Sequence, residues 1–375
     1  MAKKATNTRK VRTNQRLLVL RFSAMGDVAL LAPVLTAMAS QYKGLSITLV
    51  TRNAFAAFFT NIPGLQVIGV NLKDHYRGVY GLYRLYRELR KLGPYDAGID
   101  AHGSTRSRIL RFFFWFEGLR FVSIVKGRRE KQRQIRRDRK ILTPLPHVVD
   151  RYLNVFARAG LQAAPDKAPY INPDTRSRSL AHTFLKKQGI AQRSNFWIGL
   201  APFSTHTPKM WPLEYMQELM GLIQRELNAT IFLFGGGSKE IEQLKAMQKP
   251  DDGSILVAGQ LDMAGEIALV RRLHLMLAMD SFNMHLAALL GIPLLSIWGA
   301  THPWSGFGPY QYDDDSIIQI PLSELPCRPC SIFGNKGCFR GDLACMVGIR
   351  PMAVLERIKF KLDGPVIDED LPQTD

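Results

Sequence analysis

The sequence predicts an α/β protein built from two doubly wound halves, each a parallel sheet covered by helices. Three observations lead to this fold class. Short apolar runs alternate with segments of helical periodicity, the alternation is interrupted near residue 126 and resumes at residue 196, and 375 residues exceed one ordinary core. An apolar content of 46% with 22% charged residues is typical of a globular chain.

The first half contains four candidate strands separated by helical patterns. The expected strands are 17–22, 46–50, 67–70 and 97–100. The expected helices are 28–40, 54–60, 77–92 and 104–115. The aromatic run 112–116 is expected to belong to the core, and contact with an apolar acceptor is its alternative role. The basic stretch 126–140 is expected to form a loop before a helix at 147–159, and 162–173 with a helical segment up to 188 is expected to connect the halves.

The second half repeats the alternation. Its expected strands are 196–200, 230–234, 254–257, 274–279 and 294–298, and its expected helices are 212–227, 239–247, 264–272 and 284–290. We therefore expect four parts: a basic tail 1–16, a first domain 17–175, a second domain 176–350, and a C-terminal helix and tail 351–375. A cleft between two such domains is a common place for a nucleotide-bearing ligand.

The bend after the first strand is the most informative local feature. Residues 21–35 read R-F-S-A-M-G-D-V-A-L-L-A-P-V-L, in which Ser23 and Gly26 allow a tight turn and Asp27 stands where the helix begins. A carboxylate at the carboxyl edge of a parallel sheet is well placed to meet a ligand. Asp is also a frequent helix cap, so capping is the alternative role for Asp27. The glycine-rich dinucleotide fingerprint is missing here, which counts against a dehydrogenase.

Loops after the strands of the second half gather further polar groups. The glycines at 235–237 follow a strand and open a helix, so their backbone can approach a phosphate or a ribose. The run S-T-H-T-P-K at 204–209 combines hydroxyls, backbone N–H groups and a lysine that suit a diphosphate. The segments 280–285 and 299–303 place more polar residues after two other strands.

The net charge of +18 is concentrated in two segments. Residues 1–16 contain six basic and no acidic side chains, and residues 126–140 contain nine basic and two acidic ones. Such blocks favour a polyanionic partner, which could be nucleic acid, an anionic membrane surface or a phosphorylated glycolipid, unless they are a solvated tail and loop. A nucleic-acid-binding module predicts aromatic residues among the basic ones, and neither segment contains any.

The apolar pattern argues against membrane insertion. The longest apolar candidate, 28–39, is too short to span a bilayer and contains Pro33. The basic N-terminus is not followed by a hydrophobic stretch of signal-peptide type, so we expect a cytoplasmic location.

All four cysteines lie in one short segment, at Cys327, Cys330, Cys338 and Cys345. C-x2-C followed by two more cysteines is compatible with structural zinc. The later spacing is not a second C-x2-C, so a loop of reduced thiols is the alternative, and disulfides are disfavoured in the cytoplasm.

Five motifs occur in order along the chain. They are the bend motif at 21–35, I-D-A-H-G-S-T-R-S-R at 99–108, K-M-W-P at 209–212, D-S-F-N-M-H-L-A-A at 280–288 and W-G-A-T-H-P at 298–303. Together, from residue 17 to about 358, they closely resemble the ADP-heptose:lipopolysaccharide heptosyltransferases of glycosyltransferase family 9. The resemblance implies a GT-B fold, with two Rossmann-like domains facing across a cleft, the acceptor mainly on the first and the nucleotide sugar mainly on the second.

The resemblance also implies the reaction. It predicts inverting transfer of heptose from ADP-heptose to a lipopolysaccharide inner-core acceptor, with no catalytic metal or other cofactor. The implied partners are the nucleotide sugar, a lipopolysaccharide core or lipid A precursor, and the anionic inner face of the inner membrane, where the enzyme is peripheral; nucleic acid is not expected. A related glycosyltransferase with another nucleotide sugar or glycan acceptor is the nearest alternative.

Matching the family's motifs residue by residue assigns roles. Asp27 matches the general base and Lys209 the lysine that balances diphosphate charge. Donor contacts are implied for Ser204, Thr205, Lys209, Gly236, Glu240, Asp280, Ser281 and His285, with Glu242 as the alternative to Glu240, and acceptor contacts are implied for His102, Arg106 and Arg108. The chain departs from the donor motif at Phe282, which occupies a glycine position, and at Met284, which replaces a small polar residue; either change could alter the fit of the donor sugar.

Overall fold

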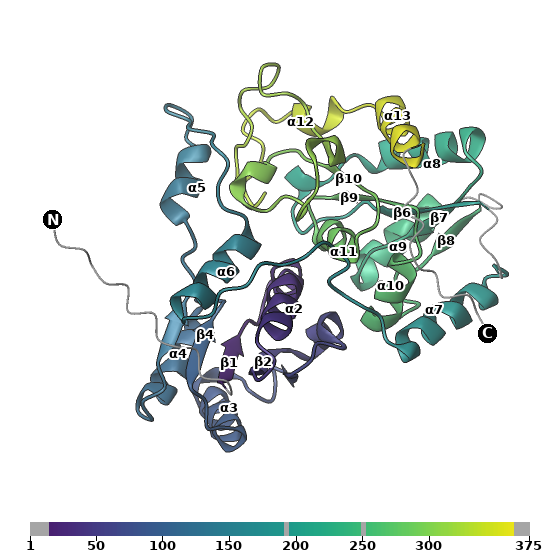
Figure 1. Ribbon diagram of the computed structural model, residues 1–375. Helices are drawn as coiled ribbons and strands as arrows, with labels where there is room; N and C mark the ends of the chain where they lie inside the picture. Colours follow the sequence, from purple (N-terminus) through teal and green to yellow (C-terminus); the bar gives the residue numbers. More distant parts are fainter. Residues whose placement is uncertain (1–14, 191–194, 249–252, 364–375) are drawn as a thin grey trace. The chain divides into compact units, whose positions relative to one another are not determined.

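The computed structural model describes residues 15–190, 195–248 and 253–363, which form two compact units (Figure 1). Unit 1 is Met1–Glu130 with Pro144–Asp174, and unit 2 is Lys131–Thr143 with Thr175–Asp375. Residues 1–14 of the expected basic tail and 364–375 of the expected C-terminal tail lie outside the described residues. No helix in the described ranges combines the length and the apolar character needed to cross a membrane.

Unit 1 is built on a five-stranded parallel sheet in the order β3-β2-β1-β4-β5. Its strands are β1 (Arg16–Leu20), β2 (Ser46–Arg52), β3 (Leu65–Val70), β4 (Ala97–Asp100) and β5 (Phe121–Ser123). Its helices are α1 (Met25–Ala29), α2 (Ala32–Gln41), the 3₁₀ helix η1 (Asn53–Phe59), α3 (Gly78–Leu92), α4 (Thr105–Trp115) and α6 (Val148–Arg158), and α5 (Arg128–Gln134) contains the boundary with unit 2.

Unit 2 is built on a six-stranded parallel sheet in the order β11-β10-β9-β6-β7-β8. Its strands are β6 (Phe196–Ala201), β7 (Ala229–Leu233), β8 (Ser254–Leu256), β9 (Leu275–Met279), β10 (Leu294–Ile297) and β11 (Ile317–Ile318). Its helices are α7 (Thr175–Lys187), α8 (Leu213–Glu226), α9 (Gly237–Met247), α10 (Met263–Val270), α11 (Phe282–Leu290), α12 (Ala344–Val347) and α13 (Pro351–Leu362), with 3₁₀ turns η2 (Thr207–Lys209), η3 (Pro303–Ser305) and η4 (Asp314–Ser316).

Both sheets are doubly wound in the same sense, because each chain segment starts in the middle of its sheet and winds first to one edge and then to the other. In unit 1 the winding reverses between β1 and β4, and in unit 2 between β6 and β9. The predicted α/β class with two Rossmann-like units is therefore confirmed, as are all nine expected strands. The sequence reading missed β5 and β11, which are edge strands of three and two residues.

The apolar residues of alternating elements form a separate core in each unit. In unit 1, Leu18 and Leu20 of β1 pack with Leu85 of α3 and Phe114 of α4. In unit 2, residues of β6, β7, β9 and β10 pack with α8 and α13, which lie side by side in Figure 1. Each sheet thus buries its faces under its own helices, as open parallel sheets require.

The helix expected at 28–40 is two helices. α1 ends at Ala29 and α2 begins at Ala32, so that Pro33 lies in the first turn of α2. Proline has no N–H to donate within a helix, and the first turn is where this loss costs least. The expected continuous helix was wrong for this reason.

The basic stretch expected as a loop contains α5, and Lys131–Thr143 belongs to unit 2 rather than to the first half of the sequence. Lys140 donates its Nζ hydrogens to the carbonyl oxygens of Pro326, Cys327 and Arg328 at 2.8–2.9 Å. Lys131 is buried with its Nζ 3.9 Å from the centre of the Phe307 ring. Part of this charge therefore holds the fold together.

The expectation that residues 112–116 belong to the core was wrong for most of them. Phe114 is 2% exposed, whereas Phe112, Trp115 and Phe116 are 56%, 66% and 67% exposed. α4 presents Leu110 and Phe114 to the core and packs Phe113 against its edge, whereas the other three aromatic side chains of the run are exposed.

This division predicts opposite effects of truncating neighbouring aromatic residues. Phe114→Ala should lower the free energy of unfolding by about 3–5 kcal/mol, because it leaves a cavity in the core of unit 1. Phe116→Ala should change it by less than about 0.5 kcal/mol. Chemical denaturation followed by circular dichroism measures both values, and equal losses would contradict the assignment.

Candidate active site

The expected site residues gather at the two positions where the winding of the sheets reverses. In unit 1, Asp27 follows β1 and His102 follows β4, and these two strands are paired with Leu20 opposite Asp100. In unit 2, Ser204 follows β6 and Asp280 follows β9, with Ala201 opposite Ala278. The carboxyl ends of strands at such a reversal form the usual ligand crevice of a doubly wound sheet.

Asp27 is held by an arginine that the sequence reading did not single out. The Asp27 Oδ2 atom lies 2.5 Å from Nη2 of Arg21, and the two side chains are 30% and 7% exposed. α1 begins after Ala24, and no side chain caps it. The capping alternative for Asp27 is therefore wrong: its carboxylate forms an ion pair and keeps one side open to solvent.

Arg21 is itself fixed from several sides. Its Nη1 donates to the Ala101 carbonyl oxygen at 2.7 Å, which is possible because β1 and β4 end side by side. Its guanidinium lies over the Tyr152 ring, 5.6 Å from the centroid, and the Tyr152 hydroxyl donates to the Asp27 carbonyl oxygen at 2.8 Å. Burial raises the pKa of Tyr152, so this hydroxyl stays a donor. The Asp27 main chain and side chain are both anchored.

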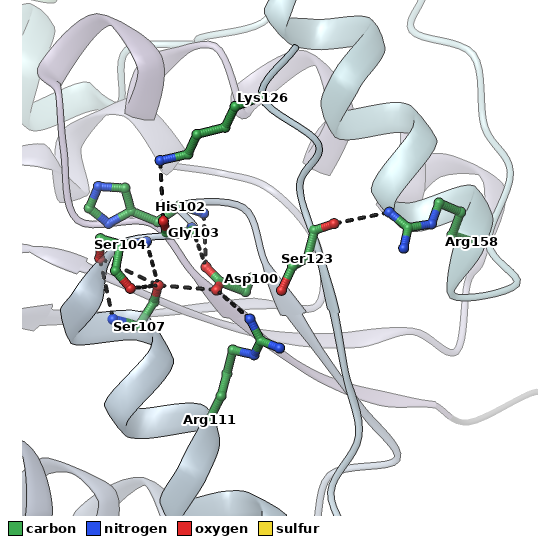
Figure 2. A network of polar contacts seen from close by, with 9 residues as sticks. All are labelled: Asp100, His102, Gly103, Ser104, Ser107, Arg111, Ser123, Lys126 and Arg158. Atoms are coloured by element: carbon green, nitrogen blue, oxygen red, sulfur yellow. Dashed lines mark hydrogen bonds and ion pairs between the residues drawn. The ribbon is translucent and has the colours of Figure 1, made fainter. Parts of the chain in front are cut away.

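The end of β4 is organised around the buried carboxylate of Asp100 (Figure 2). The backbone N–H groups of His102 and Gly103 donate to Oδ1 at 3.0 and 2.7 Å. The Ser107 hydroxyl and the Arg111 guanidinium reach Oδ2 at 3.1 and 3.2 Å. Asp100 thus joins the loop after β4 to the first turns of α4, where Ser104 and Ser107 form a capping box.

His102 contacts residues at the ends of both β1 and β4: its backbone N–H donates to Asp100, and its ring lies beside Ser23. Its Nε2 is 3.3 Å from the Ser23 hydroxyl. Burial, followed by the positive charges of Arg21 and Lys126, lowers the pKa of His102 to about 4. His102 is therefore a neutral imidazole at physiological pH, able to donate or accept a hydrogen bond but carrying no charge.

A cavity of about 410 Å³ opens beside α4 within unit 1. It is lined by Gly103, Arg108, Arg111, Ser123, Ile124, Val125, Lys126, Gly127, Arg128, Arg129 and Glu130. Five of these side chains are basic and one is acidic. Two buried polar atoms of the lining, Arg111 Nε and Ser123 Oγ, have no hydrogen-bond partner within the described residues. The cavity can therefore accept an anion with several oxygen atoms.

The basic side chains in and beside this cavity repel one another. Burial, followed by the positive charges of Arg21 and Arg128, lowers the pKa of Lys126, whose Nζ donates to the Gly103 carbonyl oxygen at 3.3 Å. A bound anion relieves this repulsion. Of the two arginines expected on the acceptor side, Arg108 lines the cavity, whereas Arg106 is exposed on α4 and is not among the lining residues.

In unit 2, Asp280 is the centre of a corresponding cluster. Its carboxylate Oδ2 lies 3.0 Å from Lys209 Nζ and accepts a hydrogen bond from the Thr301 hydroxyl at 2.7 Å. The Ser204 hydroxyl donates to the Asp280 carbonyl oxygen at 2.9 Å. The structure therefore brings together three of the expected donor residues, and adds Thr301 to them.

The position of Lys209 is restricted by the loop that carries the cysteines. A Cβ atom at Gly334 would lie only 2.3 Å from Cδ of Lys209, so the lysine stem lies directly on the glycine backbone. Arg328 holds that loop by donating to the carbonyl oxygens of Gly299 and Trp298 at 2.6 and 3.1 Å. Lys209 is 14% exposed, so it retains access to a ligand.

The glycine turn after β7 is fixed by an acidic residue of α9. The Gly236 N–H donates to Glu240 Oε2 at 2.7 Å, whereas Glu242 is exposed on the same helix. Glu240 therefore lies at the turn, as the donor-side expectation requires, although part of its carboxylate already binds the backbone. Thr205 is exposed in the loop after β6.

The helix after β9 presents Ser281 at its start. Ser281 is the N-cap residue of α11, but its hydroxyl makes no capping hydrogen bond and has no hydrogen-bond partner among the described residues. His285 is 8% exposed one turn further on. Met284, one of the two departures from the family motif, is fully buried and therefore packs inside the unit rather than facing solvent. Phe282, the other departure, is half-buried.

The cysteines do not form a metal centre in the part of the chain that the structure describes. All four are free thiols, and no group of three or more His, Cys, Asp or Glu side chains within 15–190, 195–248 and 253–363 could hold a metal ion. Burial raises the pKa of Cys345 to about 11 and also raises that of Cys330.

Two Rossmann-like units, each a parallel sheet with one reversal of its winding, give the architecture of the GT-B fold. Two solved structures share this architecture. The family 9 glycosyl transferase of Veillonella parvula has a TM-score of 0.74 and 19% identity, covering 95% of this chain and 99% of its own. Escherichia coli heptosyltransferase WaaC with ADP has a TM-score of 0.64 and 21% identity, covering 92% and 100%.

The chain belongs to glycosyltransferase family 9 (heptosyltransferase), whose family model matches residues 82–332. Among curated relatives, lipopolysaccharide heptosyltransferase 1 of Pseudomonas aeruginosa is 25% identical over 325 residues, covering 84% of this chain and 86% of the relative. Lipopolysaccharide core heptosyltransferase OpsX of Haemophilus influenzae is 22% identical over 331 residues, covering 83% and 89%. The family resemblance expected from the motifs is confirmed.

The lowered pKa of His102 predicts how stability depends on pH. Between about pH 6.5 and 4, an unfolded histidine with the ordinary pKa of 6.5 binds a proton, whereas folded His102 does not. Protonation therefore favours the unfolded chain, and the contribution of neutral His102 to the free energy of unfolding is lost as pH falls through that window. Replacing His102 by Gln should reduce the loss between neutral pH and about pH 5 by about 1 kcal/mol, allowing for the partial exposure of the ring.

The measurement is denaturant unfolding of the wild type and His102→Gln at both pH values, with His182→Gln, an exposed histidine of α7, as the control. The wild-type difference also contains His302, whose pKa burial lowers to about 4, so the comparison with the variant isolates His102. An unchanged pH dependence in His102→Gln would show that the ring is not held neutral.

Proposed function

We propose that this glycosyltransferase transfers heptose from ADP-heptose to an anionic inner-core sugar of a lipopolysaccharide precursor, with inversion at the anomeric carbon and with Asp27 as the general base. The observation that carries the proposal is the Asp27 carboxylate, fixed by buried Arg21 at the carboxyl end of β1 and open to solvent on one side. The family 9 relatives are lipopolysaccharide heptosyltransferases, and one structural neighbour is a heptosyltransferase with ADP, which supports the substrate class.

The chemistry needs one base and one stabilised leaving group. The acceptor hydroxyl gives its proton to Asp27 as its oxygen forms a bond to the anomeric carbon, and the bond from that carbon to the diphosphate oxygen breaks with its electron pair leaving on ADP. Arg21 orients the carboxylate and balances its charge, so the base is in place before the acceptor arrives.

Unit 2 supplies the groups that suit the donor. Lys209 is positioned by Asp280 and by the Gly334 backbone, which favours electrostatic stabilisation of the departing diphosphate without reorganisation of the side chain. The unbonded Ser281 hydroxyl and the start of α11 offer donors to phosphate oxygens. We assign Glu240 and Gly236 to the ribose, because Glu240 lies at the glycine turn after β7. Ser204, Thr205 and His285 follow other strands of the same sheet and are assigned to the donor as well.

The basic cavity of unit 1 supports an acidic acceptor. Arg108, Arg111, Lys126 and Arg128 can pair with a carboxylate or phosphate, and Ser123 can donate a hydrogen bond. Together with neutral His102 these groups lie on the same unit as Asp27, as acceptor recognition requires. Nothing in this scheme calls for a cofactor beyond the donor substrate.

We further propose that the enzyme works at the inner, cytoplasmic face of the inner membrane, because a lipid-anchored acceptor lies there. The basic stretch 126–140 is an unsuitable sole anchor, since its side chains Lys131, Arg137 and Lys140 engage their own chain. The other basic segment, residues 1–16, falls almost entirely outside the described residues.

Two variants test the two halves of the proposal. Asp27→Asn should keep the fold and ADP-heptose binding, because Asn still offers an oxygen to Arg21, but turnover should fall by about two to four decades. Lys209→Met should instead weaken ADP-heptose binding measured by calorimetry, while Lys239→Met, an exposed lysine of α9, should not. Near-wild-type turnover in Asp27→Asn would refute the base assignment, and unchanged donor binding in Lys209→Met would refute the donor site.

A further inference from the structure

Unit 1 exposes a group of large apolar side chains on two adjacent helices. We call it the aromatic face: Val79, Tyr80 and Tyr83 of α3 and Phe112, Trp115 and Phe116 of α4, each between 42% and 79% exposed. α3 and α4 pack against each other, so these residues belong to one part of the surface. Clusters of this kind on a soluble unit mark an interaction site.

The aromatic rings form a continuous series. Trp115 and Phe116 have ring centres 5.2 Å apart, and Phe116 and Phe112 are 5.0 Å apart. Phe112 continues to half-buried Phe113 at 6.2 Å, and Phe113 reaches Tyr83 across the helix pair at 5.5 Å. The face is therefore one surface that joins the two helices, and Phe114 and Leu110 supply the packing of α4 without it.

The charges around the face are basic. Arg87 follows Tyr83 by one turn of α3, Arg108 precedes Phe112 by one turn of α4, and both are exposed. The acidic groups nearby are fewer: Glu88 accepts a hydrogen bond from the Tyr76 hydroxyl and keeps its charge, and Glu117 pairs with Arg90 at 2.7 Å. Basic side chains outnumber acidic ones on both helices, so an approaching anionic surface meets a net positive charge beside the apolar rings.

We propose that the aromatic face is a membrane-binding surface that inserts into the headgroup region of an anionic bilayer. Trp and Tyr favour this region because their rings are apolar and their polar tips remain hydrated, and flanking arginines attract anionic lipid. The number and size of the rings provide the apolar contact that an interfacial anchor needs in addition to charge.

The aromatic face lies next to the basic cavity on α4, so membrane binding would bring the cavity to a lipid-anchored acceptor. This role of the face rests on the proposed function. Arg108 and Arg111 line the cavity, and they lie one helical turn before Phe112 and Trp115 on α4. With the rings in the headgroup region, the cavity lies close to the membrane surface. An acidic sugar of a lipid-anchored acceptor then reaches it while the acyl chains stay in the bilayer.

A second copy of the chain fits the face less well. A twofold interface would place the same patch on both partners, and with it the basic side chains Arg87 and Arg108 of both copies. Like charges at the edge of an interface oppose association, whereas an anionic lipid surface favours it.

The test compares wild type with the triple variant Phe112→Gln, Trp115→Gln, Phe116→Gln, and with Phe360→Gln, which removes an equally exposed aromatic ring from α13 of unit 2. Binding is measured by co-sedimentation with vesicles of phosphatidylethanolamine and phosphatidylglycerol, and with vesicles of phosphatidylcholine alone. The triple variant should bind the anionic vesicles roughly a hundredfold more weakly, and Phe360→Gln should bind like wild type. Phosphatidylcholine vesicles should bind wild type weakly.

Fluorescence gives a second readout that does not depend on the triple variant. Trp197, Trp211 and Trp298 are buried, and Trp304, which is 39% exposed, is not part of the aromatic face. The anionic vesicles should therefore blue-shift the emission of Trp115, and the shift should disappear in Trp115→Phe while binding persists. The proposal would be overturned if the triple variant bound vesicles as tightly as wild type. In that case, loss of a wild-type dimer in the triple variant would show that a second copy of the chain binds the face instead.

An activity assay separates this inference from the proposed function. With a deacylated, water-soluble acceptor, the triple variant should turn over like wild type, and only transfer to the acceptor embedded in vesicles should fall. Transfer to neither acceptor by the wild type, with vesicle binding through the face intact, would refute the proposed function and leave the membrane contact standing. Equal loss on both acceptors would overturn the membrane contact.

Discussion

The position of Asp27 depends on a guanidinium that is almost cut off from water. Arg21 uses one Nη for the Asp27 carboxylate and the other for the Ala101 carbonyl oxygen, and the Tyr152 ring covers it. Removing Arg21 would leave the Asp27 carboxylate and the Ala101 carbonyl oxygen without this partner, whereas Asp27→Asn keeps an oxygen facing the guanidinium. Three features of unit 1 therefore fix the position of the Asp27 carboxylate: the pairing of β1 with β4, the bend into α1, and the packing of α6, which carries Tyr152. The chemistry we propose uses that carboxylate.

Unit 2 follows the same principle with the charges exchanged. There the carboxylate of Asp280 is buried and fixed by Thr301, and the cation Lys209 keeps access to solvent. Arg328 and Lys140 support this cluster indirectly by holding the loop whose Gly334 backbone lies on the lysine stem. One unit thus presents a fixed carboxylate and the other a fixed cation, which are the two charges that the inverting transfer we propose would use.

The sequence predicted the parts of this protein that depend on periodicity, and missed those that depend on tertiary partners. Buried parallel strands read as apolar runs, so their positions were correct. Residues 112–116 are consecutive aromatics that surround a helix completely, so their pattern carries no information about which side meets the core. Arg21 and Lys140 were missed because an Ala101 carbonyl or a loop backbone has no sequence signature, whereas Asp27, Lys209 and Asp280 stand in motifs at strand ends.

The most direct test of the account is a crystal structure of the enzyme with a non-transferable ADP-heptose analogue and a soluble inner-core acceptor. The measured quantity is the distance from the Asp27 carboxylate to the acceptor hydroxyl nearest the anomeric carbon. We predict a hydrogen bond of about 3 Å, with the hydroxyl on the side of the sugar opposite the diphosphate. An acceptor hydroxyl that is hydrogen-bonded to another base, with the Asp27 carboxylate paired only with Arg21 and too far away to take the proton, would contradict the claim that Asp27 is the general base.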